Sequence, residues 1–581
     1  MALRSSLLLI ILSGLAFGQS IPAKQDSASH SQVGPLDTNG EQPSIDFLAG
    51  SAIEVFTMAV ADVYSAGTLE PIGTQNDGFG ILTSLDMPPG LESIFLPHFY
   101  PHTRYLHTGR LKRDNRVADF DNDGFPDVIS NTYDCVDLQN PDDVAKLYHN
   151  NGDGTFAEVS SPFKDLNGNP IEIRGRGETI VVADFNNDGF LDIFIPFYTY
   201  TTPVDPDCFN DPTCQTGTCP NSPQAYLLIN DGTGHFTDVA DAAGVSLRNL
   251  SHLLSAEGGQ ALDFNGDGLI DFYAGSHLFI NTGVDSNGIP HFVDQGPAMG
   301  LPQFHDEGVK FIDFDNSGYL SLVLFGPSTG PLLYRYNGST FTYQPDAFPA
   351  HLQYSETFGG NAYDIDNDGL DDVLVVGGTR CDPKIFLNSS GAFQRVHPLA
   401  RGFTLDKSGD PLQLLCNGAG GLAFGDFDND GLIDVAYAAR TQPALAYFKN
   451  NTATTNGSFV VEVLGPNGEH NQQGRVVRAS PRSHPDVVMT RVVDSGSGYL
   501  AQNQYPLLIG TPYMEPHMVT VLLPSSVPPQ TPVTISFTIS PGQKAQVFAP
   551  STAHPGGMVT LNPVRPFTFD AALYPAAQWI W

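Results

Sequence analysis

A nine-residue acidic pattern that recurs along this chain constrains its fold more than any other feature. The copies are DFDNDGFPD from Asp119, DFNNDGFLD from Asp184, DFNGDGLID from Asp263, DFDNSGYLS from Asp313, DIDNDGLDD from Asp364 and DFDNDGLID from Asp426. The first aspartates are separated by 65, 79, 50, 51 and 62 residues. Self-similarity with a period of this size indicates an array of similar structural units.

Each copy is followed by an apolar run and then by a hairpin-like segment such as LYHNNGDGTFAEV or LLINDGTGHFTDV. Apolar residues, an Asn/Gly turn and a returning strand are typical of a β-hairpin, so each unit is predicted to be a four-stranded sheet. Radial packing of such sheets buries their faces and leaves only short edges, which favours an all-β propeller. A β-solenoid is the alternative, but its repeats are far shorter. A degraded copy, AVADVYSAGTLEPI with Asp62 and Glu70, raises the predicted number of blades to seven.

The acidic loops have the donor pattern of a calcium site. Calcium takes six to eight oxygen ligands, and positions one, three, five and nine offer side-chain oxygens while position seven offers a carbonyl. The glycine at position six permits the sharp turn. Magnesium prefers fewer protein oxygens and more water, so about five or six Ca²⁺ ions are predicted. The expected ligands are Asp119, Asp121, Asp123, Phe125 and Asp127; Asp184, Asn186, Asp188, Phe190 and Asp192; Asp263, Asn265, Asp267, Leu269 and Asp271; Asp313 and Asp315; Asp364, Asp366, Asp368, Leu370 and Asp372; and Asp426, Asp428, Asp430, Leu432 and Asp434.

Two questions about these loops stay open at the level of sequence. The loop at Asp313 has Ser317 and Ser321 where acids are expected, so its occupancy is undecided. An EF-hand shares the start of the pattern, but it needs a glutamate at position twelve and flanking helices. Position twelve here is Ser130, Ile195, Ala274, Leu324, Val375 or Tyr437, and the flanks are β-rich, which argues against the EF-hand.

The ends and the charge of the chain bound its location and partners. Residues 1–19 combine Arg4, an apolar run and small residues, which predicts a signal peptide and export, with 20–50 as a linker or N-terminal strand. No later stretch is long and apolar enough for a membrane span. With 27 basic and 63 acidic residues among 581, the formal charge of −36 disfavours nucleic acid and anionic membranes as partners.

Unusual residues gather on the face of the predicted disc opposite the acidic loops. Glu178, Glu257 and Glu307 each lie six residues before an acidic loop in three successive units, so they are either a carboxylate cluster at the axial opening or ordinary surface acids. His252 and His305 lie nearby, and the aromatic insert with Tyr198 and Tyr200 either stacks on a ligand or covers a blade edge.

The cysteines and sequons leave several alternatives. An exported chain allows disulfides, which the loose spacing favours over a zinc site. The topology places Cys135 near one of the three cysteines of the insert and makes Cys381 and Cys416 neighbours. The candidate residues are Cys135, Cys208, Cys214, Cys219, Cys381 and Cys416. The five N-x-S/T sequons, at Asn249, Asn337, Asn388, Asn450 and Asn456, leave glycosylation undecided.

The acidic loops resemble the FG-GAP or VCBS repeats of integrin α-like propellers over residues 51–455, with FGDFDNDG at 424–431 as the best match. Residues 456–581 form a series of β-type runs, and NGEHNQQGRVV with VVDSGSGYLAQNQYPLLIGTP resembles an ASPIC/UnbV domain. That order of domains is similar to the cartilage acidic protein family. The resemblance implies a secreted, calcium-dependent binding or adhesion protein.

Three functional hypotheses follow. The first is a non-enzymatic extracellular recognition module for a glycan or protein ligand. It is favoured because the sequence lacks H-E-x-x-H and G-x-x-x-x-G-K motifs. The alternative is a calcium-dependent polysaccharide lyase or hydrolase that uses the axial glutamates and histidines. The third is a structural scaffold in an envelope complex. The sequence leaves the identity of the ligand and the oligomeric state open.

Overall fold

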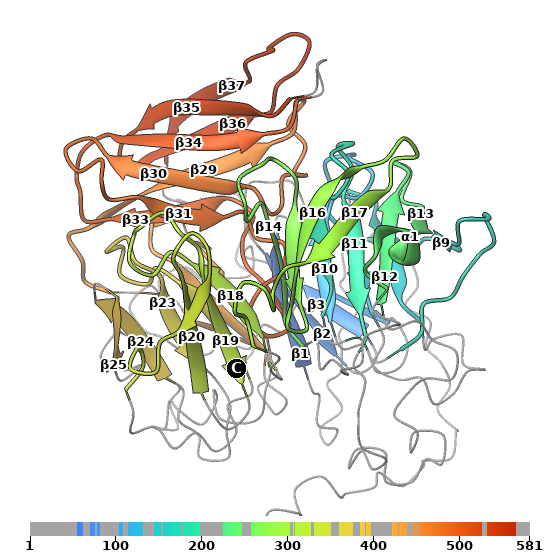
Figure 1. The fold of residues 1–581 in the computed structure, drawn as a ribbon, viewed down its shortest axis with the longest axis horizontal. Helices are drawn as coiled ribbons and strands as arrows, with labels where there is room; N and C mark the ends of the chain where they lie inside the picture. The colour runs from blue at the N-terminus through green and yellow to red at the C-terminus, as the bar shows by residue number, and fades with distance from the viewer. Residues whose placement is uncertain are drawn as a thin grey trace, which may run out of the picture.

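A computed structural model describes residues 55–61, 70–75, 78–81 and 104–107 and most of 114–564. Within the latter range it leaves out 132–143, 153–154, 198–224, 247–256, 303–305, 327–329, 350–358, 376–383, 397–420, 439–444 and 526–530 and single residues 176, 178, 307, 390, 428, 449 and 451. The described part is almost entirely β-structure, with one short helix, α1 (Ala240–Ala243) (Figure 1).

Seven sheets form the blades. Blade 1 contains β1 (Val55–Ala61), β2 (Glu70–Gln75), β3 (Gly78–Ile81) and β4 (Arg104–His107), and blade 2 contains β5 (Asn115–Ala118), β6 (Asp127–Ser130), β7 (Lys146–Asn150) and β8 (Phe156–Glu158). Blade 3 contains β10 (Val181–Ala183), β11 (Asp192–Pro196), β12 (Ala225–Asn230), β13 (Phe236–Asp238) and the added β9 (Phe163–Lys164). Blade 4 contains β14 (Gly259–Leu262), β15 (Asp271–Ala274), β16 (His277–Val284) and β17 (Pro290–Asp294).

The remaining blades repeat this antiparallel order. Blade 5 contains β18 (Val309–Ile312), β19 (Ser321–Gly326), β20 (Gly330–Tyr336) and β21 (Phe341–Tyr343). Blade 6 contains β22 (Gly360–Tyr363), β23 (Asp372–Val375), β24 (Lys384–Ser389) and β25 (Ala392–Val396), and blade 7 contains β26 (Leu422–Gly425), β27 (Asp434–Ala438) and β28 (Leu445–Phe448). The acidic loop joins the first two strands in blades 2 to 7.

The first strands of the blades form a closed ring. In order, β1, β5, β10, β14, β18, β22 and β26 each contact the next, and β26 contacts β1 again. A hydrophobic cluster lies between each pair of adjacent blades from blade 2 to blade 7, because the apolar residues of each strand face the neighbouring sheet. The seven-bladed all-β propeller is therefore confirmed, and the degraded first copy does form a blade.

Asparagine side chains link neighbouring blades. Asn230, at the end of β12, donates from Nδ2 to Phe120 O of blade 2 at 2.7 Å and to Leu191 O of its own loop at 3.0 Å. The same pair of bonds is made by Asn281, Asn388 and Asn450 in later blades. Because these amides are buried, each one satisfies two backbone carbonyls that water does not reach.

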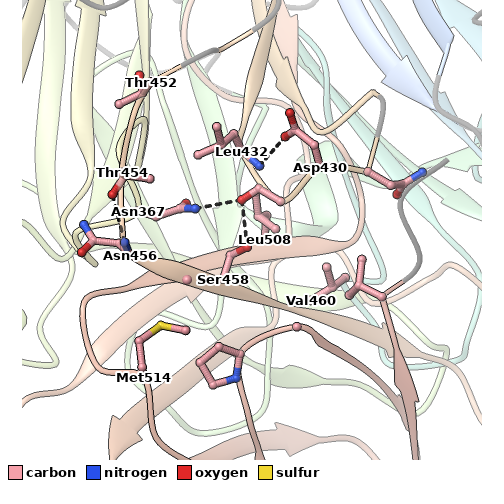
Figure 2. A pocket seen from close by; sticks show the side chains of 16 residues that line it. Asn367, Asp430, Leu432, Thr452, Thr454, Asn456, Ser458, Val460, Leu508 and Met514 are labelled. Atoms are coloured by element: carbon pink, nitrogen blue, oxygen red, sulfur yellow. Dashed lines mark hydrogen bonds between the residues drawn. The ribbon is translucent and has the colours of Figure 1, made fainter. Parts of the chain in front are cut away.

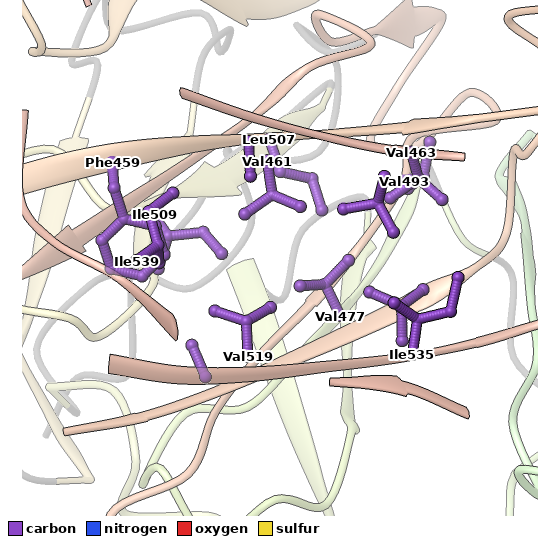
Figure 3. Packing of buried hydrophobic residues seen from close by; sticks show 14 of the residues in the cluster. Phe459, Val461, Val463, Val477, Val493, Leu507, Ile509, Val519, Ile535 and Ile539 are labelled. Atoms are coloured by element: carbon purple, nitrogen blue, oxygen red, sulfur yellow. The ribbon is translucent and has the colours of Figure 1, made fainter. Parts of the chain in front are cut away.

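The C-terminal part forms a β-sandwich. One sheet has the order β33–β29–β36–β37 and the other β31–β30–β34–β35. Their inner faces meet in one core that includes Phe459, Val477, Ile509 and Val519 (Figure 3). The strands are β29 (Gly457–Leu464), β30 (Val476–Pro481), β31 (Met489–Val492), β33 (Leu507–Thr511), β34 (His517–Leu523), β35 (Val533–Ile539), β36 (Gln543–Phe548) and β37 (Met558–Pro563). The sandwich packs against one side of the propeller (Figure 1).

Between β31 and β33 the chain leaves the sandwich and enters the propeller axis. We call residues 494–504 the plug; it includes β32 (Ala501–Gln502), which pairs in parallel with β1. Backbone or side-chain hydrogen bonds join the plug to the first strands of the other six blades at Val117, Val182, Ala261, Val309, Gly360 and Phe424. The plug therefore contacts all seven first strands.

The tip of the plug reaches the far end of the axis. Gly308 and Gly359 lie just before β18 and β22, at the ends opposite the acidic loops. A Cβ atom at Gly308 would lie 2.6 Å from Gly498, and one at Gly359 would lie 2.7 Å from Tyr499 Cβ, so both positions require glycine. Below the tip, Lys310 Nζ lies 3.0 Å from Asp494 Oδ2 and 2.8 Å from Ser497 Oγ, in a buried ion pair.

Candidate metal centres

Each acidic loop folds around the carboxylate of its first aspartate. In blade 2, Asp119 Oδ1 accepts from Asp123 N–H at 3.0 Å and Asp119 Oδ2 accepts from Gly124 N–H at 2.8 Å. The other five loops repeat both bonds at 2.9 to 3.1 Å. The fourth residue has a positive φ and is asparagine in five loops and Gly266 in the other, since these residues tolerate that conformation.

The aspartate at position nine ties the loop to the hairpin. Asp127 Oδ2 accepts from Phe120 N–H at 3.1 Å, and its Oδ1 accepts from Asn150 N–H on β7 at 2.9 Å. Asp192, Asp271, Asp372 and Asp434 make the same two bonds in their blades. A charge bound in the loop would therefore act directly on the third strand.

The loops bring the predicted ligands together. Oxygen atoms of Asp119, Asp121 and Asp123 lie within 4.8 Å of one another, and so do those of Asp364, Asp366 and Asp372. Donors that share one Ca²⁺ at roughly 2.3–2.6 Å have spacings of this order. The backbone N–H of the residue at position seven donates to the carboxylate at position five, as in Phe125 to Asp123 at 2.8 Å. Asp428 lies outside the described residues.

These carboxylates are costly to ionise without a cation. Burial, with a smaller contribution from Asp121, raises the pKa of Asp127 to about 7. Burial likewise raises the pKa of Asp271 to about 8, and Asp263 and Asp267 add to the effect. Burial and the neighbouring Asp188 raise the pKa of Asp184 to about 7. A dication among these oxygens would offset both effects and hold the groups ionised, so the donor set fits a hard divalent metal.

The loop at Asp313 keeps the backbone turn, but it has Ser317 and Ser321 at positions five and nine, where the other loops have aspartates. Ser317 and Gly318 still donate to Asp313, and Ser321 Oγ accepts from Tyr336 N–H at 3.1 Å. Arg335 reaches the loop from β20, with its Nη2 2.7 Å from Asp315 Oδ2. In this loop a guanidinium supplies positive charge at a carboxylate that would otherwise be a metal ligand.

The C-terminal sandwich covers the acidic loops of blades 3 to 7, which sequence analysis did not anticipate. Arg475 donates to Gly268 O at 2.8 Å and to Asn187 Oδ1 at 2.6 Å, and so bridges the loops of blades 4 and 3. Arg491 donates to Gly369 O of blade 6 at 3.1 Å and lies 3.2 Å from Asp371. Val488 N–H and Ser458 Oγ bond the loops of blades 5 and 7. Both arginines are isolated basic residues in β-type runs, so sequence offers no signal for their role.

A pocket lies where blade 7 meets the sandwich. Its volume is about 460 Å³, and its wall combines the blade 7 loop at Asp430–Leu432 with Ser458, Leu508 and Met514 of the sandwich (Figure 2). The Ser458 hydroxyl donates to Gly431 O at 2.8 Å on one side of this pocket. The pocket therefore adjoins a predicted metal loop directly.

Most predicted residues of the opposite face lie outside the described residues. These are Glu178, Glu307, Tyr198 and Tyr200 and the six cysteines, Cys135, Cys208, Cys214, Cys219, Cys381 and Cys416. Glu257 is described, and it is 7% exposed. The carboxylate cluster and the disulfides thus stay predictions. The plug, which sequence analysis did not predict, fills the axis below that face.

Comparison with known proteins bears on these loops. The FG-GAP-like repeat family matches residues 119–195 and 364–437, each of which starts on an acidic loop and runs into the next strands. The chain carries FG-GAP-like repeats. It is 27% identical over 345 residues to mouse cartilage acidic protein 1, covering 56% of this chain and 48% of that protein. The human protein is 26% identical, with 56% and 47% covered, so the chain spans about half the length of the curated relatives it matches.

Solved structures resemble the FG-GAP-like chain only distantly. An Agrocybe aegerita lectin described as recognising non-reducing terminal N-acetylglucosamine aligns with a TM-score of 0.35 at 16% identity, over 60% of this chain and 80% of the lectin. The V. cholerae biofilm matrix protein Bap1 aligns with a TM-score of 0.29 at 13% identity, over 77% and 69%. Scores this low carry no argument about ligands. Among the described residues no helix is long and apolar enough to cross a membrane.

Proposed function

We propose that this chain is an exported calcium-binding propeller protein that acts as an extracellular recognition or adhesion module for a glycan or protein ligand. The observation that supports it most is the acidic loop: five copies, in blades 2, 3, 4, 6 and 7, keep the oxygen donors of a calcium site. The proposed ligands are the residues predicted from the sequence. In blade 5, Arg335 takes the place of an ion.

The role proposed for calcium is to make a rigid scaffold. In blades 2, 3, 4, 6 and 7 the aspartate at position nine ties the first two strands of the blade to the third, as Asp127 does in blade 2. The sandwich also forms hydrogen bonds with five of the six acidic loops, those of blades 3 to 7. Calcium would therefore stabilise the blades and the docking of the sandwich together, and long loops on such a scaffold are suited to binding.

The proposed architecture divides the chain near residue 456. In this proposal residues 51–455 form the propeller, 456–581 the ASPIC/UnbV-like domain, 20–50 a linker or N-terminal strand, and 1–19 a signal peptide that directs export. The signal peptide lies outside the described residues. A soluble ligand-binding role fits the acidic surface better than a role on nucleic acid or anionic lipid.

The alternative is a calcium-dependent polysaccharide lyase or hydrolase that acts at the axial opening. The plug occupies the axis and Glu257 is buried, which favours recognition over catalysis at that place. Glu257→Ala tests the alternative: loss of turnover of an acidic polysaccharide would support it.

The test of the main proposal is a screen of glycans and extracellular proteins with the full chain, in calcium and in chelator. Wild type is compared with a deletion of residues 201–222, which removes the loop insert of blade 3. Calcium-dependent binding that the deletion abolishes is the expected result. Binding of no glycan or protein in calcium would contradict the proposal.

A further inference from the structure

In blades 2 and 5, the residue before the third-strand position that bonds to the ninth residue of the loop reaches the acidic loop of its blade. In blade 2 this residue is His149, which precedes Asn150, and in blade 5 it is Arg335, which precedes Tyr336. In blades 3, 4 and 6 the same position holds the hydrocarbon side chains of Ile229, Ile280 and Leu387, and in blade 7 it holds Lys449, which lies outside the described residues. Of the residues at this position in the six blades, His149 alone carries a side chain that can offer a lone pair to a metal.

His149 and Arg335 both reach the carboxylate at position three of their loop. Arg335 Nη2 lies 2.7 Å from Asp315 Oδ2, and His149 Nδ1 lies 3.3 Å from Asp121 Oδ2. Arginine has no lone pair to offer a metal, whereas a neutral imidazole is a common metal ligand. At this position the side chain in blade 5 has no donor atom for a metal, whereas the side chain in blade 2 has one.

His149 lies inside the group of predicted ligands. Its Nδ1 is 3.1 Å from Asp127 Oδ1 as well as 3.3 Å from Asp121 Oδ2, and the three residues meet within 4.8 Å. Both distances are longer than the 2.7 Å of the hydrogen bond between His277 Nδ1 and Asp294. An ion bound roughly 2.2 Å from each donor places neighbouring donors about 3.1 Å apart. The spacing around His149 Nδ1 matches neighbouring positions in the shell of a small divalent ion.

We infer that the blade 2 loop is a mixed nitrogen and oxygen site for a first-row transition-metal dication, with His149 as a ligand beside Asp121 and Asp127. Imidazole suits first-row transition metals, whereas calcium prefers oxygen donors only. The side chains of His149, Asp121 and Asp123 are 27 to 38% exposed, so a hydrated ion reaches the site. The inference rests on the proposed metal-binding function and assigns one loop to a different metal.

Mn²⁺ is the probe, because it accepts oxygen and nitrogen donors and its electron spin reports directly bound nitrogen. The full chain, stripped of metal and then loaded with Mn²⁺, is examined by electron spin echo modulation. We expect a ¹⁴N coupling from one imidazole in wild type and none in His149→Leu. We also expect His149→Leu to bind Mn²⁺ at this one site at least about tenfold more weakly than wild type. Loss of a residue that only orients a metal ligand already lowers metal affinity by about that factor.

Two further variants keep the result interpretable. His149→Gln retains a polar side chain, so it serves as the test if His149→Leu disturbs folding. It should also lose the nitrogen coupling. His291→Leu is the matched control, because His291 Nε2 lies 3.7 Å from Asp285 Oδ2 in the β16–β17 hairpin and contacts no carboxylate of the blade 2 loop. This control should keep the coupling.

Different results would contradict the mixed-donor site in blade 2 and the proposed calcium-binding function. Mn²⁺ bound without nitrogen coupling, or a coupling that survives in His149→Leu and His149→Gln, would overturn the inference and leave the calcium loops in place. Absence of any bound Mn²⁺ or Ca²⁺ would overturn the proposed function itself.

Discussion

The side-chain amide of Gln502 pairs with both backbone groups of Val117. Gln502 Oε1 accepts from Val117 N–H at 2.9 Å, and Gln502 Nε2 donates to Val117 O at 2.8 Å, across 385 residues of sequence. Gln502 thus behaves as one more strand neighbour of β5 at the axis. It shows how the C-terminal domain completes the ring of first strands.

Replacing Gln502 by leucine should destabilise the whole protein. The buried N–H and C=O of Val117 would lose their partners, at a cost of about 2 to 4 kcal/mol in free energy of unfolding. Chemical denaturation of the two proteins measures it. Gln394→Leu, on the exposed side of β25, is the control and should change stability by less than about 0.5 kcal/mol. Equal effects of the two substitutions would contradict the role of the plug.

The sequons at Asn388 and Asn450 should carry no glycan. Each asparagine is buried, and each amide donates to two backbone carbonyls, which a modified side chain could not do. Peptide mass spectrometry of protein from a glycosylating host tests this. Asn337 is the comparison, since it lies exposed in the turn after β20. A glycopeptide containing Asn450 in folded protein would refute the assignment of the linking asparagines.

The blade 5 loop should gain an ion when its acids are restored and its arginine is removed. The variant Ser317→Asp, Ser321→Asp, Arg335→Leu rebuilds the pattern of the other loops and should bind one more Ca²⁺ than wild type. Isothermal titration measures the number of ions. The variant that restores both acids but retains Arg335 is the control and should gain none. An extra ion in the control would show that Arg335 does not exclude metal.

Acid should weaken the sandwich through Glu462. Although burial opposes it, the hydrogen bond from His470 and the charge of Lys544 lower the pKa of Glu462 to about 2. A carboxyl whose pKa is lowered on folding stabilises the protein above its unfolded pKa, and this contribution is lost as pH falls from about 4.5 towards 2. At pH 7, Glu462→Gln should lower the free energy of unfolding by about 2 kcal/mol. The effect is no larger because His470 and Lys544 are partly exposed, so that solvent screens their interaction with the carboxylate. Unfolding free energies at pH 7 and pH 3 check this, and an undiminished difference at pH 3 would contradict it.

Sequence predicted the parts of this molecule that repeat, and it missed the parts that occur once. The acidic loops, the hairpins and the seven blades recur with a period, so each copy supports the others, and even the degraded first blade could be aligned. The plug occurs once and bonds to residues hundreds of positions away, such as Val117, so no local pattern predicts that it lies in the propeller axis. Its sequence, DSGSGYLAQNQ, carries part of the ASPIC/UnbV resemblance, but on its own it predicts only a glycine-rich loop.

The same distinction holds within the candidate sites. Ligand positions on the loop could be read because they are adjacent in sequence. His149 and Arg335 lie on the third strand and reach the loop only after the hairpin folds, although their place before Asn150 and Tyr336 could have been compared between copies. Arg475 and Arg491 come from another domain, and their contacts with the loops depend on docking that sequence does not encode locally.

We propose that bound dications hold the blades together. The most direct measurement is the number of ions per folded chain by elemental analysis, combined with melting in calcium and in chelator. Saturation of each site at a hundred times its dissociation constant adds about 2.7 kcal/mol. We expect about five ions and a fall in melting temperature of more than about 10 °C on chelation. Folded protein that contains no dication and melts at the same temperature in chelator would contradict the account.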